Sequence, residues 1–232
     1  MVNVDILIAG EHLVARPAGT LFWPASRMLI VGDLHLGRAR GMAMRGQGFL
    51  PPYADDDTLL RLAAEIEATD PGILLLLGDS FDDQASADGT AAALADQFAA
   101  LARRLHVLWV AGNHDPRPVA NLPGRAVSAW RDGPLIFRHI ASAATLPPGE
   151  AEISAHYHPQ AALWRRGTRV SRRCFLLGQE RAILPAFGTY TGGMDARDPV
   201  FDPLLGTGAM ALLLGQHLTP VPRERLDAPV RV

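Results

Sequence analysis

The sequence predicts an α/β protein whose first half contains parallel strands and whose second half is richer in antiparallel strands and loops. Continuous apolar runs at residues 28–31, 73–77 and 107–111 have the composition of strands buried on both faces. Two segments with helical spacing of their apolar residues, 55–68 and 87–105, separate these runs. Strands that alternate with helices in this way form parallel sheets, because each helix carries the chain back across the sheet.

The elements outside this alternation are predicted to pair differently. Residues 4–8 and 12–15 flank a glycine-containing turn and are expected to form a hairpin, and residues 20–23 are expected to form a third strand. In the second half, glycine, proline and arginine clusters separate short apolar runs, which favours antiparallel strands over further crossover helices. These runs lie at residues 135–137, 152–154, 174–177, 182–183 and 209–214.

Both predicted helices rest on periodicity. Apolar side chains in residues 55–68 recur at the spacing of one helical face, and Leu94 and Phe98 lie on one side of residues 87–105. Three aspartates, residues 55–57, stand at the start of the first helix, where aspartate caps a helix and complements its dipole. We therefore assign this acidic run to the helix N-terminus and not to a metal site.

Length and composition indicate one globular domain, expected over residues 1–219, with a peripheral tail over residues 220–232. Hydrophobic residues make up 48% of the chain and charged residues 20%, which is ordinary for a soluble protein. No apolar run is long enough to cross a bilayer, and the N-terminus has no signal-like segment. We therefore expect a cytoplasmic protein that does not bind a membrane. The single cysteine, Cys174, is expected in the core.

The charge pattern alone does not identify a substrate. The formal net charge is −2, so no global basic field attracts nucleic acid. All 22 positively charged residues are arginines. Two explanations of this bias remain open. One is the general composition of the chain, and the other is that guanidinium groups make bidentate contacts with phosphates where arginines gather at a site.

Polar motifs follow three of the predicted buried strands. Asp33 and His35 come after residues 28–32, Asp79 follows Gly78, and Asn113 follows Gly112. In α/β sheets, ligands bind beyond the carboxyl ends of the strands. His156 and His158 alternate along an extended segment and so point the same way. This set offers nitrogen and oxygen donors without a thiolate, which fits Mn²⁺, Fe or Zn²⁺.

The ordered motifs D-x-H, G-D-x-x-D, G-N-H-D, a lone H and H-x-H, matched over Asp33 to His158, resemble the signature of the calcineurin-like metallophosphoesterases. The resemblance implies a sandwich of two mixed β-sheets flanked by helices, with a two-metal site at one sheet edge and Mn²⁺ as the usual activating ion. It also implies that Asp79 bridges the two metals. The implied ligands are Asp33, His35, Asp79 and His158 for the first metal, and Asp79, Asn113, His139 and His156 for the second.

Two positions depart from the family pattern. Ala155 stands where the last motif normally opens with glycine, and His139 is followed by Ile140 where glycine is frequent. Neither change removes a ligand, but the second leaves His139 open to an alternative interpretation as a histidine at a strand end. By the same resemblance, His114 would protonate the leaving alkoxide. Asp115 would orient His114, or serve only as a turn residue.

Further segments resemble one bacterial subgroup of this family, the ligase-associated DNA damage response endonucleases (PdeM). Examples are Leu21 to Ala25, the H-Y-H-P segment from His156, and Leu184 to Gly193. This resemblance implies DNA as the substrate, a DNA-repair context, and association with a DNA ligase and a helicase. The subgroup often has lysine where this chain has Arg38.

Several residues near the motifs are candidates for substrate contact. Arg38, Arg40 and Arg45 follow the first metal motif and are expected to contact phosphates. A second arginine cluster either flanks the site or forms a solvated face; its members are Arg165, Arg166, Arg169, Arg172 and Arg173. Tyr157 and Trp164 stack on bases or pack within the fold. Similarly, Phe187 and Tyr190 belong to a loop over the site or to a tight turn.

Three functions remain open on the sequence. The first is a metal-dependent phosphodiesterase or endonuclease that acts on DNA. The second keeps this chemistry for nucleotides or other small phosphoesters, which the modest net charge favours. The third is a non-catalytic scaffold with the same fold, although a scaffold does not require His114 or a full ligand set.

Overall fold

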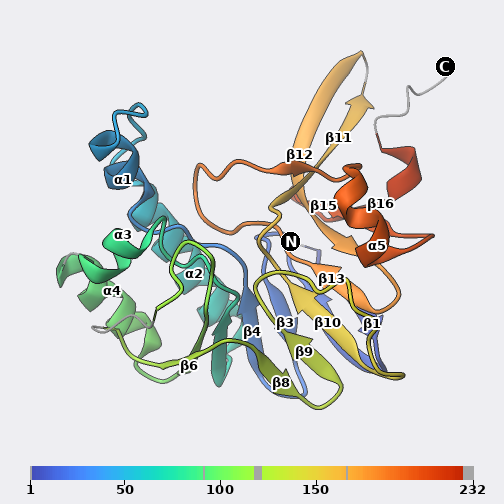
Figure 1. Cartoon of the computed structure of the whole chain (residues 1–232), viewed down its shortest axis with the longest axis horizontal. Helices are drawn as coiled ribbons and strands as arrows, with labels where there is room; N and C mark the ends of the chain where they lie inside the picture. Colours follow the sequence, from blue (N-terminus) through green and yellow to red (C-terminus); the bar gives the residue numbers. More distant parts are fainter. Residues whose placement is uncertain (1, 91, 118–121, 166, 227–232) are drawn as a thin grey trace.

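Two β-sheets pack face to face in the computed structural model, which describes residues 2–90, 92–117, 122–165 and 167–226 (Figure 1). The first sheet has the strand order β1-β2-β3-β4-β5-β6-β7. Its first four strands pair antiparallel and the remainder pair parallel, as predicted for the buried apolar runs. Their bounds are β1 Val4–Ile8, β2 Glu11–Ala15, β3 Leu21–Trp23, β4 Met28–Val31, β5 Ile73–Leu76, β6 His106–Val110 and β7 Arg125–Val127.

The second sheet has the order β14-β11-β12-β13-β10-β9-β8, and β15 pairs with both β12 and β16. It is also mixed, because β10 is parallel to β9 and β13 whereas β12 is antiparallel to its neighbours. The strands are β8 Trp130–Asp132, β9 Leu135–Phe137, β10 Ala151–Ser154, β11 Pro159–Arg165, β12 Thr168–Leu177, β13 Arg181–Ile183, β14 Met194–Asp195, β15 Met210–Leu213 and β16 Thr219–Pro222.

Helices cover the outer faces of the sandwich (Figure 1). α2, α3 and α4 pack on the first sheet, α1 projects beyond the end of α2, and α5 lies on the second sheet. Two short 3-10 helices, η1 and η2, complete the described chain. The bounds are α1 Arg38–Met44, α2 Ala54–Thr69, α3 Gln84–Asp88, α4 Ala92–Ala102, α5 Asp202–Leu205, η1 Pro199–Phe201 and η2 Arg223–Arg225.

The helix predicted over residues 87–105 is wrong in one respect, since α3 and α4 replace it. The Asp83 carboxylate caps α3 by accepting from the Ser86 N–H at 2.7 Å. Gly89 ends α3, and the Thr90 hydroxyl donates to the carbonyl of Ser86 at its end. Glycine and threonine favour helix ends in this way. They interrupt the segment although its apolar spacing continues, so the spacing alone predicted one helix where the chain forms two.

Alternating side chains of the central strands build two apolar layers. Met28, Ile30 and Leu75 face the second sheet, where they meet Phe137 and Phe175. The intervening side chains of the same strands pack under the helices. This outer layer includes Leu29, Val31, Leu74, Leu76, Leu59, Leu62 and Phe98. The arrangement confirms the two-sheet sandwich and the prediction that β4 and β5 are buried on both faces.

The C-terminal part contributes an edge strand. β16 pairs with β15, and Leu226 beyond it is buried in the apolar cluster under α5. The tail predicted over residues 220–232 therefore begins within β16, and residues 227–232 lie outside the described part of the chain. The division at residue 219 stays a prediction. In the part of the chain that the structure describes, no helix has the length and apolar character needed to span a membrane.

Cys174 lies in β12 and is fully buried, and burial raises the pKa of its thiol. We predict that a chromogenic disulfide reagent does not label the folded protein, because the thiolate is the reactive form. The same reagent should release one equivalent of chromophore per chain in guanidinium chloride, where the thiol is exposed. Rapid labelling of the folded protein would contradict a core position for this residue.

Candidate metal centre

The predicted ligands come together where the strand ends of the two sheets meet. Asp33 and His35 follow β4, Asp79 follows β5, and His139 and His156 follow β9 and β10. Backbone hydrogen bonds join these loops. The His35 N–H donates to the Asp79 carbonyl at 3.0 Å, and the His156 N–H donates to the Asp33 carboxylate at 3.1 Å. Both sheets therefore build one site.

The ligand-bearing loops carry backbone strain. Five of the seven predicted ligands have positive φ angles: Asp33 (26°), His35 (48°), Asp79 (44°), His156 (71°) and His158 (48°). Residues other than glycine rarely adopt positive φ angles, and those that do cluster at functional sites. The sandwich thus holds these loops in conformations that short free loops would avoid.

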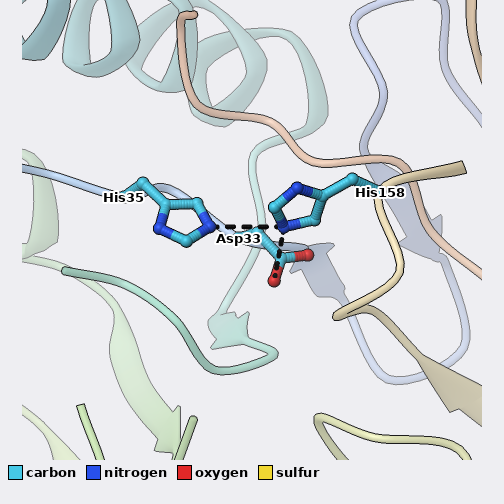
Figure 2. Close-up of side chains that lie close together, drawn as sticks. All are labelled: Asp33, His35 and His158. Atoms are coloured by element: carbon cyan, nitrogen blue, oxygen red, sulfur yellow. Dashed lines mark hydrogen bonds and ion pairs between the residues drawn. The ribbon is translucent and has the colours of Figure 1, made fainter. Parts of the chain in front are cut away.

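One set of side chains, which we call the first ligand group, consists of Asp33, His35 and His158. One potential ligand atom from each lies within 4.8 Å of the others. The His158 Nε2 is 3.2 Å from the His35 Nε2 and 3.3 Å from an Asp33 carboxylate oxygen (Figure 2). Asp33 and His35 are buried, and His158 is partly exposed. The three donor atoms therefore converge on one point, which is accessible to solvent on the side of His158.

A second ligand group consists of Asp79, His139 and His156, whose ligand atoms also lie within 4.8 Å of one another. The His139 Nε2 is 3.2 Å from Asp79 Oδ2 and 3.2 Å from His156 Nδ1. It is also 2.9 Å from the side-chain oxygen of Asn113. His139 Nδ1 donates to the Leu77 carbonyl at 2.7 Å, which leaves Nε2 to act as a metal ligand. His139 therefore lies beside Asp79, Asn113 and His156, although Ile140 follows it.

The protonation of His35 and Asp79 suits divalent cations. By contrast, burial alone would lower the pKa of His139, but its hydrogen bond to Asp79 and the charges of Asp33 and Asp79 outweigh burial and raise it. Burial lowers the pKa of His35 to about 4, against the opposing charge of Asp33, so the ring is neutral at pH 7. Burial alone would raise the pKa of Asp79, but its hydrogen bond and charge interaction with His139 outweigh burial and lower it to about 2. Neutral imidazoles and ionised carboxylates are the forms that bind metal. The donor set therefore fits two divalent cations.

Two glycines leave room for this packing. A side chain at Gly112 would place its Cβ 2.2 Å from Asp79 Oδ1, and one at Gly78 would place it 2.5 Å from His139 Nδ1. Gly78 also has a φ of +84°. The glycines that precede Asp79 and Asn113 thus permit a close approach of these loops.

One family model matches this chain over most of its length. The model described as calcineurin-like phosphoesterase matches residues 26–171, more than half of the chain. The chain belongs to the calcineurin-like phosphoesterase family. Among solved structures, the crystal structure of Pseudomonas putida nuclease MPE matches with a TM-score of 0.76 and 24% identity, covering 95% of this chain and 100% of that chain. This likeness shows that the two share a fold.

A second solved structure, that of Yfce, a phosphoesterase from E. coli, matches with a TM-score of 0.40 and 12% identity. It covers 87% of this chain and 96% of that chain. No curated protein gives a significant match. Family membership makes this protein a metal-dependent phosphoesterase, and each of its two ligand groups could hold a metal ion.

In this phosphoesterase, His114 lies beside the metal centre without belonging to either ligand group. Its backbone N–H donates to Asp79 Oδ1 at 2.9 Å, and its Nε2 is 3.9 Å from Asp79 Oδ2. Its Nδ1 is 2.6 Å from the Asp82 carbonyl oxygen. Because a carbonyl only accepts, Nδ1 carries the proton and Nε2 remains free to exchange one. The side chain is 41% exposed, so a substrate can reach it.

Asp115 is buried and contacts the loop after β5. Its carboxylate accepts from the backbone N–H of Phe81 at 3.1 Å. Burial raises the pKa of this carboxyl to about 6. The contact that orients the His114 ring comes from the Asp82 carbonyl, so Asp115 supports the loop after β5. A catalytic role for Asp115 stays a prediction.

The sequence patterns did not single out Asp82, the second aspartate of the G-D-x-x-D motif. It is 4% exposed, and its carboxylate accepts from Arg38 at 3.0 Å and from Arg45 at 2.6 Å. Its Oδ1 is also 3.8 Å from His35 Nδ1. The fixed spacing of this aspartate from Asp79 was the signal that could have found it. Two arginines predicted to bind substrate are therefore paired with Asp82.

The remaining candidate contacts divide between surface and interior. Arg40 is exposed, with a long contact of 3.5 Å to the Gly89 carbonyl. Arg173 is turned inward and donates to the Ala186 carbonyl at 3.0 Å, while Arg169 and Arg172 are exposed on β12. Arg166 lies outside the described residues, as does the Arg165 side chain. A role of these arginines in substrate binding stays a prediction.

The aromatic candidates also divide. Tyr157 packs edge-on between His156 and Phe201, with ring centroids 5.0 and 5.4 Å away. Phe187 is fully buried beneath the Arg61 guanidinium. By contrast, Trp164 is 44% exposed and Tyr190 is 42% exposed. Only the last two of these four are available to a substrate.

Proposed function

We propose that this protein is a dinuclear-metal-dependent phosphodiesterase that cleaves phosphodiester bonds in DNA. One observation carries the proposal: two separate ligand groups lie together at the sheet edge with His114 beside them. The first metal would be held by the first ligand group with Asp79, and the second by the second ligand group with Asn113. Asp79 would bridge the two ions, with Mn²⁺ as the preferred metal and Fe or Zn²⁺ as alternatives.

The chemistry that follows uses named side chains of this chain. When bound, two divalent cations stabilise charge on the phosphate and lower the pKa of water. The Asp82 carbonyl holds the His114 ring with Nε2 toward the centre. When the ring carries a second proton on Nε2, this atom can donate that proton to the departing alkoxide oxygen, which removes charge from the leaving group. The donation leaves the neutral ring protonated on Nδ1. Asp33 and Asp79 are buried carboxylates that balance the cations.

Support for DNA comes from likeness and not from the charge of the surface. The shared fold with a Pseudomonas putida protein titled a nuclease and the resemblance to PdeM both favour a nucleic acid. We place the enzyme in a DNA-repair context in the cytoplasm, in association with a DNA ligase and a helicase. These associations rest on the subgroup resemblance.

One observation favours a second candidate, a phosphoesterase for nucleotides or other small phosphoesters. Arg38 and Arg45 are two of the three arginines predicted to contact phosphates after the first motif, and Asp82 pairs with both. Phosphate contacts from these residues would have to compete with a buried carboxylate. A non-catalytic scaffold is disfavoured because the ligand groups and His114 are all in place.

Metal removal tests the reaction. Protein stripped with a chelator is expected to lose turnover of bis-p-nitrophenyl phosphate, because the metal ions would polarise the phosphate and activate the attacking water. Addition of Mn²⁺ should restore the rate, and elemental analysis should find two ions per chain. Full activity of the metal-free protein would contradict the proposal. The monoester p-nitrophenyl phosphate serves as the comparison substrate and should be hydrolysed more slowly.

Binding of DNA separates the two substrate classes. Affinity for single-stranded and nicked DNA should fall steeply with salt, since phosphate contacts release counterions. Absence of binding, or a flat salt response, would favour small phosphoesters.

A further inference from the structure

A loop of residues 188–193 is fastened at both ends to the first ligand group. At its start, the Gly188 N–H donates to the Asp33 carbonyl at 2.9 Å. Just after its end, the Met194 N–H donates to the His158 carbonyl at 3.2 Å. In Figure 2 this segment passes close to His158, as the orange part of the trace. The loop therefore lies at the edge of the metal centre.

Thr189 fixes the same loop to α2. Its hydroxyl donates to Asp57 at 2.6 Å and accepts from Arg61 at 2.7 Å. Its backbone N–H donates to the Thr58 hydroxyl at 3.1 Å. Three polar contacts at one residue hold the loop against the first two turns of the helix. The next residue, Tyr190, is consequently presented from a fixed support.

Tyr190 is strained and exposed at once. Its φ angle is 60°, a conformation unfavourable for a bulky side chain, yet 42% of the residue is exposed. Its hydroxyl is 3.4 Å from the hydroxyl of Tyr53, which precedes α2 and is 55% exposed. Core packing therefore does not compensate for the strain. Strained residues of this kind cluster at active sites and ligand clamps.

Tyr53 is also connected to the metal centre, through the helix α2 that begins at the next residue. Asp55, two residues later, accepts from the Gly37 N–H at 3.0 Å, and Gly37 lies two residues after His35. The two tyrosines thus stand on segments that are bonded to the backbone at or near all three members of the first ligand group. These tethers place the tyrosine pair on segments that adjoin the first ligand group.

We propose that the tyrosine pair, Tyr53 and Tyr190, is a stacking platform for a base next to the scissile phosphate of single-stranded DNA. The inference rests on the proposed function and adds to it a strand preference and a subsite. Aromatic rings bind bases through their faces without selecting a sequence, so they suit a nuclease that acts on unpaired strands. A duplex keeps its bases stacked on one another and offers none to the pair.

Substitutions at the pair test this platform. Tyr190→Asn removes the ring and retains a residue that tolerates the left-handed backbone, and Tyr53→Ala removes its neighbour. Each should weaken binding of a fluorescent single-stranded oligonucleotide to the metal-free protein about 10-fold, as loss of one base–aromatic stack does. The ratio of kcat/KM on the oligonucleotide to kcat/KM on bis-p-nitrophenyl phosphate should fall by a similar factor. Leu60→Ala, at an exposed position of α2, is the matched control and should leave both readouts unchanged.

Two further experiments distinguish base stacking from the contact between the two hydroxyl groups. Tyr53→Phe and Tyr190→Phe lose the hydroxyl contact but keep the rings, and both should bind the oligonucleotide as the unaltered protein does. An oligonucleotide that lacks the base beside the cleaved phosphate should bind the unaltered protein about 10-fold more weakly. The same abasic oligonucleotide should show no further loss with the ring-deleted variants, because the two changes remove one interaction.

The outcomes separate the platform from the proposed function. Unchanged oligonucleotide binding in the Tyr53→Ala, Tyr190→Asn double variant, with an unaltered protein that cleaves DNA, would overturn the platform alone. An unaltered protein that hydrolyses bis-p-nitrophenyl phosphate but cleaves no DNA would overturn the DNA substrate. Equal losses on both substrates would assign the tyrosines to support of the metal centre. A shift in size-exclusion volume without a binding change would assign them to contact between copies. Either assignment overturns the platform.

Discussion

Asp79→Asn is expected to lower kcat on bis-p-nitrophenyl phosphate by at least about 10³-fold. Loss of a partner outside a metal's own ligands costs roughly 10- to 100-fold, and the proposed bridging ligand should cost more. Asp79 accepts from the His114 N–H at 2.9 Å and contacts His139 Nε2 at 3.2 Å, so it also holds two neighbours of the centre. The amide keeps the size of the side chain but removes the negative charge that would lie between the two proposed cations.

Steady-state rates and elemental analysis of the same samples test this expectation. The variant should contain fewer than two ions per chain at the Mn²⁺ concentration that fills the unaltered protein. Asp5→Asn is the control, because Asp5 is an exposed aspartate that contacts only His12 among the described residues. It should retain the full rate and metal content. Retention of both ions and of the rate in Asp79→Asn would show that Asp79 does not bridge.

The parts of the fold that sequence could predict are those set by burial. Residues of β4, β5 and β6 form continuous apolar runs because helices cover one face and the second sheet covers the other. That pattern fixed both their direction and the edge where Asp33, Asp79 and Asn113 gather. The prediction was less accurate where local signals competed. Gly89 and Thr90 end one helix inside a segment whose apolar spacing continues.

The candidate site shows a similar division. Residue type and order predicted the donors, and the structure brings His139 to them in spite of Ile140. The supporting contacts depended on tertiary structure. The Asp82 carboxylate meets Arg38 and Arg45 only because α1 packs beside the loop after β5, and α1 has too little apolar periodicity to be predicted. The group that orients His114 is the backbone carbonyl of Asp82, and a contact made by a backbone carbonyl cannot be predicted from residue types.

His114→Ala is expected to lower kcat on an oligonucleotide by roughly 10²- to 10⁴-fold, the usual contribution of a general acid. The backbone N–H that donates to Asp79 survives this substitution, so the loss reports on the ring alone. The effect should depend on the leaving group. A deoxyribose alkoxide needs a proton as it departs, whereas p-nitrophenolate leaves as a stabilised anion. The variant should therefore retain far more of its rate on bis-p-nitrophenyl phosphate.

His12→Ala supplies the matched control, since His12 is an exposed histidine in β2 whose partner is Asp5. It should leave both substrates unaffected. Equal losses on the two substrates in His114→Ala would contradict proton donation, because an acid acts on the leaving group. Such a result would instead assign the ring to binding the phosphate, where Nε2 stands 3.9 Å from Asp79. The leaving-group dependence thus distinguishes an acid from a phosphate ligand at the same atom.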